Sequence, residues 1–135
     1  MYLLDTNLIS ELRRGRKCDP NVRKWAQATR RDRHCISVLS LGEIRKGIEM
    51  LRRKAPRQCP VFERWLEKLQ EDYAADILPV DAPVCEHWGR LMAGRTLPVI
   101  DGLIAATALV HGLTMATRNA GDFEKTGVVV VDPWE

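Results

Sequence analysis

Four acidic residues, spread along the chain, have side chains suited to binding a hard cation: Asp5, Glu43, Asp101 and Asp122. Two carboxylates about 4 Å apart repel by roughly 4 kcal/mol at an effective dielectric near 20. A divalent cation such as Mg²⁺ or Mn²⁺ removes that repulsion, because carboxylate oxygens are the ligands it prefers. Protonation of one or two of the carboxylates would also remove the repulsion between them. A bound cation can activate a water and stabilise a leaving oxygen on a phosphodiester, so no protein nucleophile is required.

Each of these acids also has a purely structural interpretation. Glu43 stands three residues after Ser40, as in a capping box. Asp5 can cap the helix after it, Asp101 can favour a helix N-terminus through the dipole, and Asp122 can be a turn residue. For any one residue taken alone, the structural interpretation is the stronger. The hypothesis of a site therefore depends on all four acids meeting at one place.

The elements that must bring the acids together are short apolar runs separated by longer helical patterns. The runs predicted as strands are 2–4, 35–38, 77–80, 113–116 and 128–131. The predicted helices cover about 6–14, the residues after Asp19-Pro20, 40–54, 60–75, the residues after Asp81, and 99–111. Strands that alternate with helices imply a parallel sheet, and unbroken apolar strands indicate that helices cover both faces. We therefore predict an α/β fold over residues 1–135 as a single domain, a three-layer α/β/α sandwich with a central, mainly parallel five-stranded sheet.

This fold predicts where the acids lie. In an open parallel sheet, sites form beyond the carboxyl ends of the strands. Asp5 ends the first predicted strand, and Glu43 is expected in the first turn of the helix after the second. Asp101 begins the nearly all-apolar helix 99–111, which we expect to be deeply buried, and Asp122 follows the fourth strand. All four are therefore predicted at one edge of the sheet.

The hydropathy, the charge distribution and the histidine and cysteine content exclude some classes of function and favour others. No apolar run approaches the roughly 18 residues of a membrane helix, and no basic segment precedes a long apolar one, so we expect a cytoplasmic protein without membrane contact. Residues 1–60 hold 15 Lys and Arg and 6 Asp and Glu, a balance of +9, whereas residues 61–135 hold 6 and 12, a balance of −6. A basic half suits a nucleic acid, although complementary solvated faces would give the same numbers. The three histidines and four cysteines show no obvious ligand or acid–base pairing, which disfavours a zinc site and a histidine-based nuclease.

The ordered motifs resemble the PIN-domain family, in particular toxins of the VapC type. The segments that carry the resemblance are Leu3-Leu4-Asp5-Thr6-Asn7-Leu8-Ile9-Ser10, Ser40-Leu41-Gly42-Glu43-Ile44 with Gly47, Asp101-Gly102-Leu103-Ile104-Ala105-Ala106-Thr107-Ala108, Thr117-Arg118-Asn119 with Asp122-Phe123, and Val131-Asp132-Pro133-Trp134. The motif Asp-Thr-Asn alone would be weak, but the ordered set covers essentially the whole chain. The resemblance implies a PIN-like fold and a metal-dependent endoribonuclease using Mg²⁺ or Mn²⁺, the toxin of a toxin–antitoxin pair.

The resemblance also implies roles for individual residues. The core acidic triad would be Asp5, Glu43 and Asp101. A fourth acid falls in some relatives at the position of Asn119 and in others at that of Asp122. Because Asn119 is a neutral oxygen ligand at best, we expect Asp122 to supply the fourth charge. Thr6 and Thr117 are expected to support the site through their hydroxyls.

The partners implied by the resemblance are an RNA substrate, a second copy in a homodimer, and a cognate antitoxin. The antitoxin's C-terminal segment would lie across the toxin and place an arginine or another group in the acidic site. Apolar faces of the early helices, including Trp25, Trp65 and Leu66, are candidates for that groove, with core packing as an equally good alternative for Trp65. RNA phosphates are expected to be guided by the arginine-rich stretches 13–17, 30–33 and 52–57, without being read for sequence.

Two other functions compete with this interpretation. A phosphatase of the haloacid-dehalogenase type would need a second aspartate at Asn7 and a lysine where the chain has Arg118. A catalytically weak RNA-binding or partner-binding PIN domain is the non-enzymatic alternative, because Asn119 reduces the negative charge. The presence of all three core acids argues against it.

Overall fold

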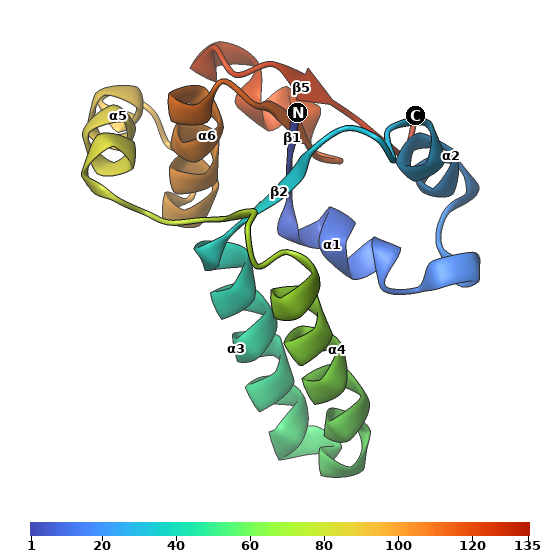
Figure 1. The fold of residues 1–135 in the computed structure, drawn as a ribbon. Coiled ribbons are helices and arrows are strands. Elements are labelled where there is room, and N and C mark those ends of the chain that lie inside the picture. The colour runs from blue at the N-terminus through green and yellow to red at the C-terminus, as the bar shows by residue number, and fades with distance from the viewer.

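The computed structural model describes residues 1–135 and contains one sheet flanked by helices (Figure 1). Its strands are β1 (Tyr2–Leu4), β2 (His34–Ser37), β3 (Ile77–Leu78), β4 (Thr114–Ala116) and β5 (Val130–Val131). They lie in the order β3-β2-β1-β4-β5, and every neighbouring pair is parallel. The predicted five-stranded sheet is therefore confirmed, and it is parallel throughout.

Six α-helices and three 3₁₀ helices connect the strands. The α-helices are α1 (Thr6–Leu12), α2 (Pro20–Ala28), α3 (Val38–Lys54), α4 (Cys59–Asp72), α5 (Ala82–Met92) and α6 (Val99–His111). The 3₁₀ helices, which the sequence analysis did not predict, are η1 (Gly15–Lys17), η2 (Pro56–Gln58) and η3 (Ala120–Thr126). No helix has both the length and the apolar character needed to cross a membrane.

Successive strand residues point to opposite faces of the sheet, and both faces are buried. Leu3 belongs to a core with residues of α5 and α6 such as Ile104. Leu4 belongs to a second core with residues of α1 to α4 such as Leu8 and Ile44. Figure 1 shows α5 and α6 on one side of the strands and α1 and α2 on the other. Burial of both faces explains the unbroken apolar strands and confirms the three-layer α/β/α sandwich.

The apolar helix α6 is buried along most of its length, as predicted. It ends at Gly112, whose φ of 64° is the left-handed conformation of a helix C-cap. It also packs very closely against α5. A Cβ added at Gly102 would lie 2.7 Å from Met92 Sδ and 3.1 Å from Trp88 Nε1. This close packing fixes the first turn of α6, which carries Asp101.

The start of α3 differs from the prediction and changes the interpretation of Glu43. The helix begins at Val38, and Ser37 caps it by accepting a hydrogen bond from the backbone N–H of Leu39. Ser40 is therefore inside the helix, and Glu43 lies in its second turn. The predicted capping box between Ser40 and Glu43 is wrong, so both side chains are available for other contacts.

The helices α3 and α4 form a hairpin that extends away from the sheet (Figure 1). Glu63 on α4 accepts hydrogen bonds from two arginines on α3, at 2.7 Å from Arg45 Nη1 and 2.6 Å from Arg52 Nη2. Both arginines also contact Glu49. These exposed pairs contribute little stability singly, but as a network they fix the packing of the two helices.

A small aromatic cluster joins α2 to the sheet through His34. The His34 ring stacks on Trp25 at 5.4 Å between centroids, and Tyr2 meets both rings edge-on. Its Nε2 lies 3.1 Å from Thr29 Oγ1. Burial lowers the pKa of His34, with an opposing contribution from Asp32 and a reinforcing one from the N-terminal ammonium.

The lowered pKa of His34 predicts that the protein loses stability in mild acid. The unfolded chain takes up a proton near the ordinary histidine pKa of about 6.5, whereas the folded protein resists protonation. This contribution to stability is therefore complete above that pH and is lost as the pH falls from about 6.5 through the lower folded pKa. We expect a lower urea midpoint at pH 5.5 than at pH 7.5. The difference should shrink in His34→Gln but not in His111→Gln, which alters an exposed histidine. Equal pH dependence in both variants would contradict this role for His34.

Candidate active site

The fold places all four predicted acids at the carboxyl edge of the sheet. Asp5 directly follows β1, and Asp122 lies in η3 after β4. The helix α6 leads into β4 and runs against the strand direction, so Asp101 in its first turn lies at the same edge. Burial raises the pKa of Asp101, and the charges of Asp5, Glu43 and Asp122 raise it further. The four side chains are thus within electrostatic reach of one another.

Asp5 is held through both of its carboxylate oxygens. Oδ1 accepts a hydrogen bond from the backbone N–H of Thr6 at 2.8 Å, and Oδ2 accepts one from Thr117 Oγ1 at 2.8 Å. Only 8% of Asp5 is exposed. The residue caps α1, as the structural interpretation suggested, and also belongs to the acidic group. Asp5 therefore both caps α1 and belongs to the acidic group, and two hydrogen-bond donors orient its side chain.

Thr6 connects Asp5 to Glu43. Thr6 Oγ1 lies 2.6 Å from Glu43 Oε1 and 2.7 Å from Ser40 Oγ. An ionised carboxylate has no proton to give, so the single hydroxyl proton of Thr6 goes to Glu43. Ser40, which is fully buried, must then donate its own proton to Thr6. The hydrogen bonds run in one direction, from Ser40 to Thr6 to Glu43.

Ser40 is a site residue that the sequence analysis missed. Its spacing of three residues from Glu43 places both on one helix face, and the same spacing is typical of a capping box. We expect Ser40→Ala to raise the dissociation constant for Mn²⁺ at these acids roughly tenfold, the size of effect usual for groups that orient a metal ligand. Ser10→Ala, which removes an exposed hydroxyl on α1, is the matched control. An unchanged Mn²⁺ dissociation constant in Ser40→Ala would show that the hydroxyl chain does not orient Glu43.

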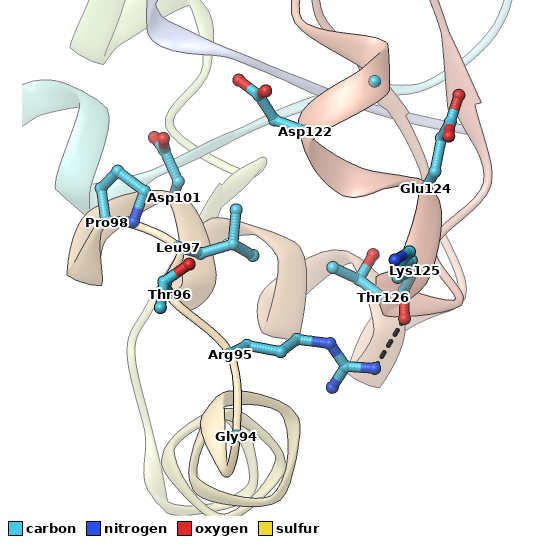
Figure 2. Close-up of a pocket in the computed structure, with 11 residues that line it drawn as sticks. Gly94, Arg95, Thr96, Leu97, Pro98, Asp101, Asp122, Glu124, Lys125 and Thr126 are labelled. Carbon is cyan, nitrogen blue, oxygen red and sulfur yellow. Dashed lines mark hydrogen bonds between the residues drawn. The ribbon is translucent and has the colours of Figure 1, made fainter.

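Asp101 and Asp122 line a polar pocket of about 540 Å³ (Figure 2). Asp122 is exposed, and Asp101 is half-buried. Asn119 enters the site through its backbone. Its N–H donates to Thr117 Oγ1 at 3.1 Å, and its carbonyl accepts from the N–H of Asp122 at 3.0 Å. Asp122 is near enough to the other acids for its charge to raise the pKa of Asp101.

The acids converge without closing into a finished ligand cage. No group of three or more His, Cys, Asp and Glu side chains is placed closely enough to hold a metal ion. The donors nevertheless fit a hard divalent cation in type and charge, because they are carboxylate oxygens; burial, and then the negative charges of the other three acids, raise the pKa of Asp101. A cation of this class would draw the four acids together and remove the repulsion.

Comparison with known proteins agrees with this arrangement of fold and acids. The family model described as the PIN domain matches residues 2–129. The chain belongs to the PIN-domain family. It is 33% identical over 141 residues to the VapC ribonuclease Y4jK of Sinorhizobium fredii strain NGR234, covering all of this chain and 99% of that protein. It is 34% identical over 141 residues to Toxin FitB of Neisseria gonorrhoeae, with 99% of each covered.

A solved structure is also similar over the full length of this PIN domain. It is the crystal structure of FitAcB from Neisseria gonorrhoeae, at a TM-score of 0.89 and 33% identity, covering all of this chain and 99% of that chain. The family resemblance of the sequence motifs is therefore confirmed at the level of the fold.

Beside Glu43, the PIN domain has an apolar groove of about 370 Å³ between α1, α3 and α4. Trp65 and Phe62 line it, and the guanidinium of Arg13 stacks 4.5 Å from the centre of the Phe62 ring. Of the three residues expected to form such a groove, only Trp65 lines it. Leu66 is buried in the core, and Trp25 belongs to the aromatic cluster around His34.

The three arginine-rich stretches of the PIN domain lie in different places. Residues 30–33 precede β2, so they lie at the edge opposite the acids, where Arg33 pairs with Asp76 at 2.6 Å. Residues 52–57 lie at the far end of the α3–α4 hairpin. Only the stretch 13–17, through Arg13, reaches the groove that Glu43 also lines. The other two stretches lie away from the acidic site, so the expected guidance of RNA phosphates is best supported for residues 13–17.

Proposed function

We propose that this chain is a metal-dependent endoribonuclease and the toxin of a toxin–antitoxin pair, acting as a single domain in the cytoplasm. The observation that supports it most directly is the convergence of four carboxylates at the carboxyl edge of a parallel sheet, where each of the others raises the pKa of Asp101. The similarity to a VapC ribonuclease and to Toxin FitB over nearly the full length of each supports the same function.

In this proposal, Mg²⁺ or Mn²⁺ would be held by Asp5, Glu43, Asp101 and Asp122. When bound, the cation supplies an activated water and a positive charge that stabilises the oxygen leaving the phosphorus. Thr117 and the backbone of Thr6 keep both oxygens of Asp5 oriented, as their 2.8 Å contacts indicate. The hydroxyl of Thr6 aligns Glu43, and the backbone of Asn119 places Asp122. The chain itself therefore contributes the negative charges that would bind the cation and the hydrogen bonds that orient those carboxylates.

The proposed partners are an antitoxin and a second copy of the chain. The groove lined by Trp65, Phe62 and Arg13 offers an apolar surface that ends at Glu43. An antitoxin segment with an apolar face and a cationic group would bury the face in the groove and place the cation on the carboxylate. Such a segment would compete with the metal for Glu43.

A catalytically weak binding domain is the second candidate. One observation favours it, because the acids do not stand closely enough to hold an ion as placed. Nothing in the structure favours the phosphatase alternative. The two remaining candidates differ in whether RNA is cut, so turnover separates them.

The deciding experiment is cleavage of a panel of structured RNAs by purified protein free of any antitoxin. We expect cutting with Mg²⁺ or Mn²⁺, loss of cutting with EDTA, and recovery when the metal is added back in excess. The Asp5→Asn protein, purified in parallel, reports contaminating nuclease. Binding of RNA and metal without any cutting by a folded protein would favour the second candidate. Absence of metal binding would overturn the proposal.

A further inference from the structure

Two separate segments face each other across the polar pocket that holds Asp101 and Asp122. One is the turn 93–98, which follows α5 and leads into the first turn of α6. The other is the 3₁₀ helix η3. No backbone hydrogen bond joins these two segments. The segments therefore need another connection to keep the two carboxylates at a fixed separation.

Arg95 provides the only hydrogen bond between the two segments. Its Nη2 donates to the carbonyl oxygen of Lys125 in η3 at 2.6 Å, and Figure 2 shows the side chain crossing the pocket to reach it. Its Nη1 donates at 2.5 Å to the carbonyl oxygen of Leu91, in the last turn of α5. One planar guanidinium thus binds two backbone carbonyls, those of Leu91 and Lys125, which lie 34 residues apart in the chain.

The chemistry of these contacts suits a permanent connection. Carbonyls at the C-terminal end of a helix carry partial negative charge, so a cation there is favourable. The donors of a guanidinium are fixed in a plane, whereas the ammonium of a lysine is a flexible point charge. Because two donors of Arg95 are already committed to backbone carbonyls, the residue is better suited to holding the pocket together than to binding a phosphate.

We propose that Arg95 is a positioning residue, which limits how far the Asp101 and Asp122 segments can separate, so that a divalent cation can draw their carboxylates together. The inference rests on the proposed metal-dependent function and adds a residue that touches neither metal nor RNA. Repulsion between the acids pushes the two segments apart when no cation is bound, and the charge-assisted bonds of Arg95 oppose that movement.

The test compares wild type with Arg95→Ala, Arg95→Lys and a control, Arg90→Ala. Arg90 lies in the preceding helix α5, 75% of its side chain is exposed, and its only ion pair is with Glu86, at 3.7 Å. Amide hydrogen exchange without metal should be faster in residues 120–127 of Arg95→Ala. Calorimetry should show the Mn²⁺ dissociation constant raised about tenfold, as for groups that orient metal ligands. In both the exchange rate and the Mn²⁺ dissociation constant, Arg95→Lys should lie between wild type and Arg95→Ala, and Arg90→Ala should match wild type.

Cleavage measured over a range of Mn²⁺ concentrations separates positioning from general destabilisation. For Arg95→Ala we expect half-saturation to rise with the dissociation constant, and the rate at saturating metal to stay within about threefold of wild type. A lower Tm with unchanged Mn²⁺ affinity, or unchanged exchange in residues 120–127, would overturn the inference. Wild type that neither binds Mn²⁺ nor cuts RNA would overturn the proposed function and the inference together. Wild type that does both, with Arg95→Ala indistinguishable from it, would overturn the inference alone.

Discussion

Asp5→Asn should abolish metal-dependent RNA cleavage, lowering the rate by at least about a thousandfold, or roughly 4 kcal/mol of transition-state stabilisation. The amide has one acceptor oxygen and no charge, so it gives the cation a weaker ligand at the most buried of the four acidic positions. The fold should survive. The amide oxygen can still accept from Thr6 N–H, and its NH₂ can donate to Thr117 Oγ1, which has acceptor capacity.

The same variant should be as stable as wild type, or more so, in the absence of metal. Removing one negative charge relieves the repulsion that raises the pKa of Asp101. Cleavage rates, circular dichroism and Tm in EDTA together check this prediction, with Asp19→Asn at the half-buried N-cap of α2 as a control for loss of a capping carboxylate. A folded Asp5→Asn protein that still cuts RNA at the wild-type rate would place the reaction elsewhere.

Phe123→Ala should have the largest effect on stability, lowering the free energy of unfolding by about 3–5 kcal/mol. Only 2% of Phe123 is exposed, and its ring packs in the core with Ile104 and Leu91. Phe123 is the buried apolar side chain that packs η3 against the core, and Asp122 is the residue immediately before it. The variant should therefore also bind Mn²⁺ more weakly than the loss of stability alone explains, because Asp122 is no longer held against the α6 side of the pocket.

Urea unfolding and Mn²⁺ calorimetry measure both effects at a temperature where Phe123→Ala remains folded. Phe123→Leu should retain most of the stability, because it keeps an apolar side chain in the same core position. Val129→Ala, at a nearby residue that is 66% exposed, should change neither quantity. A loss below about 1 kcal/mol in Phe123→Ala would mean that η3 is held by other contacts.

The sequence was sufficient to predict the layers of the fold because the strands are buried on both faces. Leu3 and Leu4 enter different cores, and this leaves an unbroken apolar run that periodicity and helix spacing can identify. The same reasoning put Asp5, Asp101 and Asp122 at the correct edge, since the ends of parallel strands lie together.

The details of the site were less predictable because they depend on contacts between segments distant in the sequence. Ser40 and Glu43 satisfy a local capping rule, and only the position of Thr6, more than 30 residues earlier, shows that they serve another purpose. Arg95 lies in a turn without any motif, and its importance depends on the carbonyl of Lys125. Long-range hydrogen bonds of this kind leave no periodic signal in the sequence.

Thr6 has an unusual consequence for mutational tolerance at the N-terminal motif. Its backbone donates to one carboxylate of the site and its hydroxyl to another, so one residue serves two acids from different elements. Only serine offers the same pair of donors, whereas valine, although similar in shape, removes the hydroxyl. In a saturation library selected for toxicity, position 6 should therefore accept serine alone. The neighbouring Asn7, whose side chain makes no hydrogen bond in the fold and is exposed, should accept many residues.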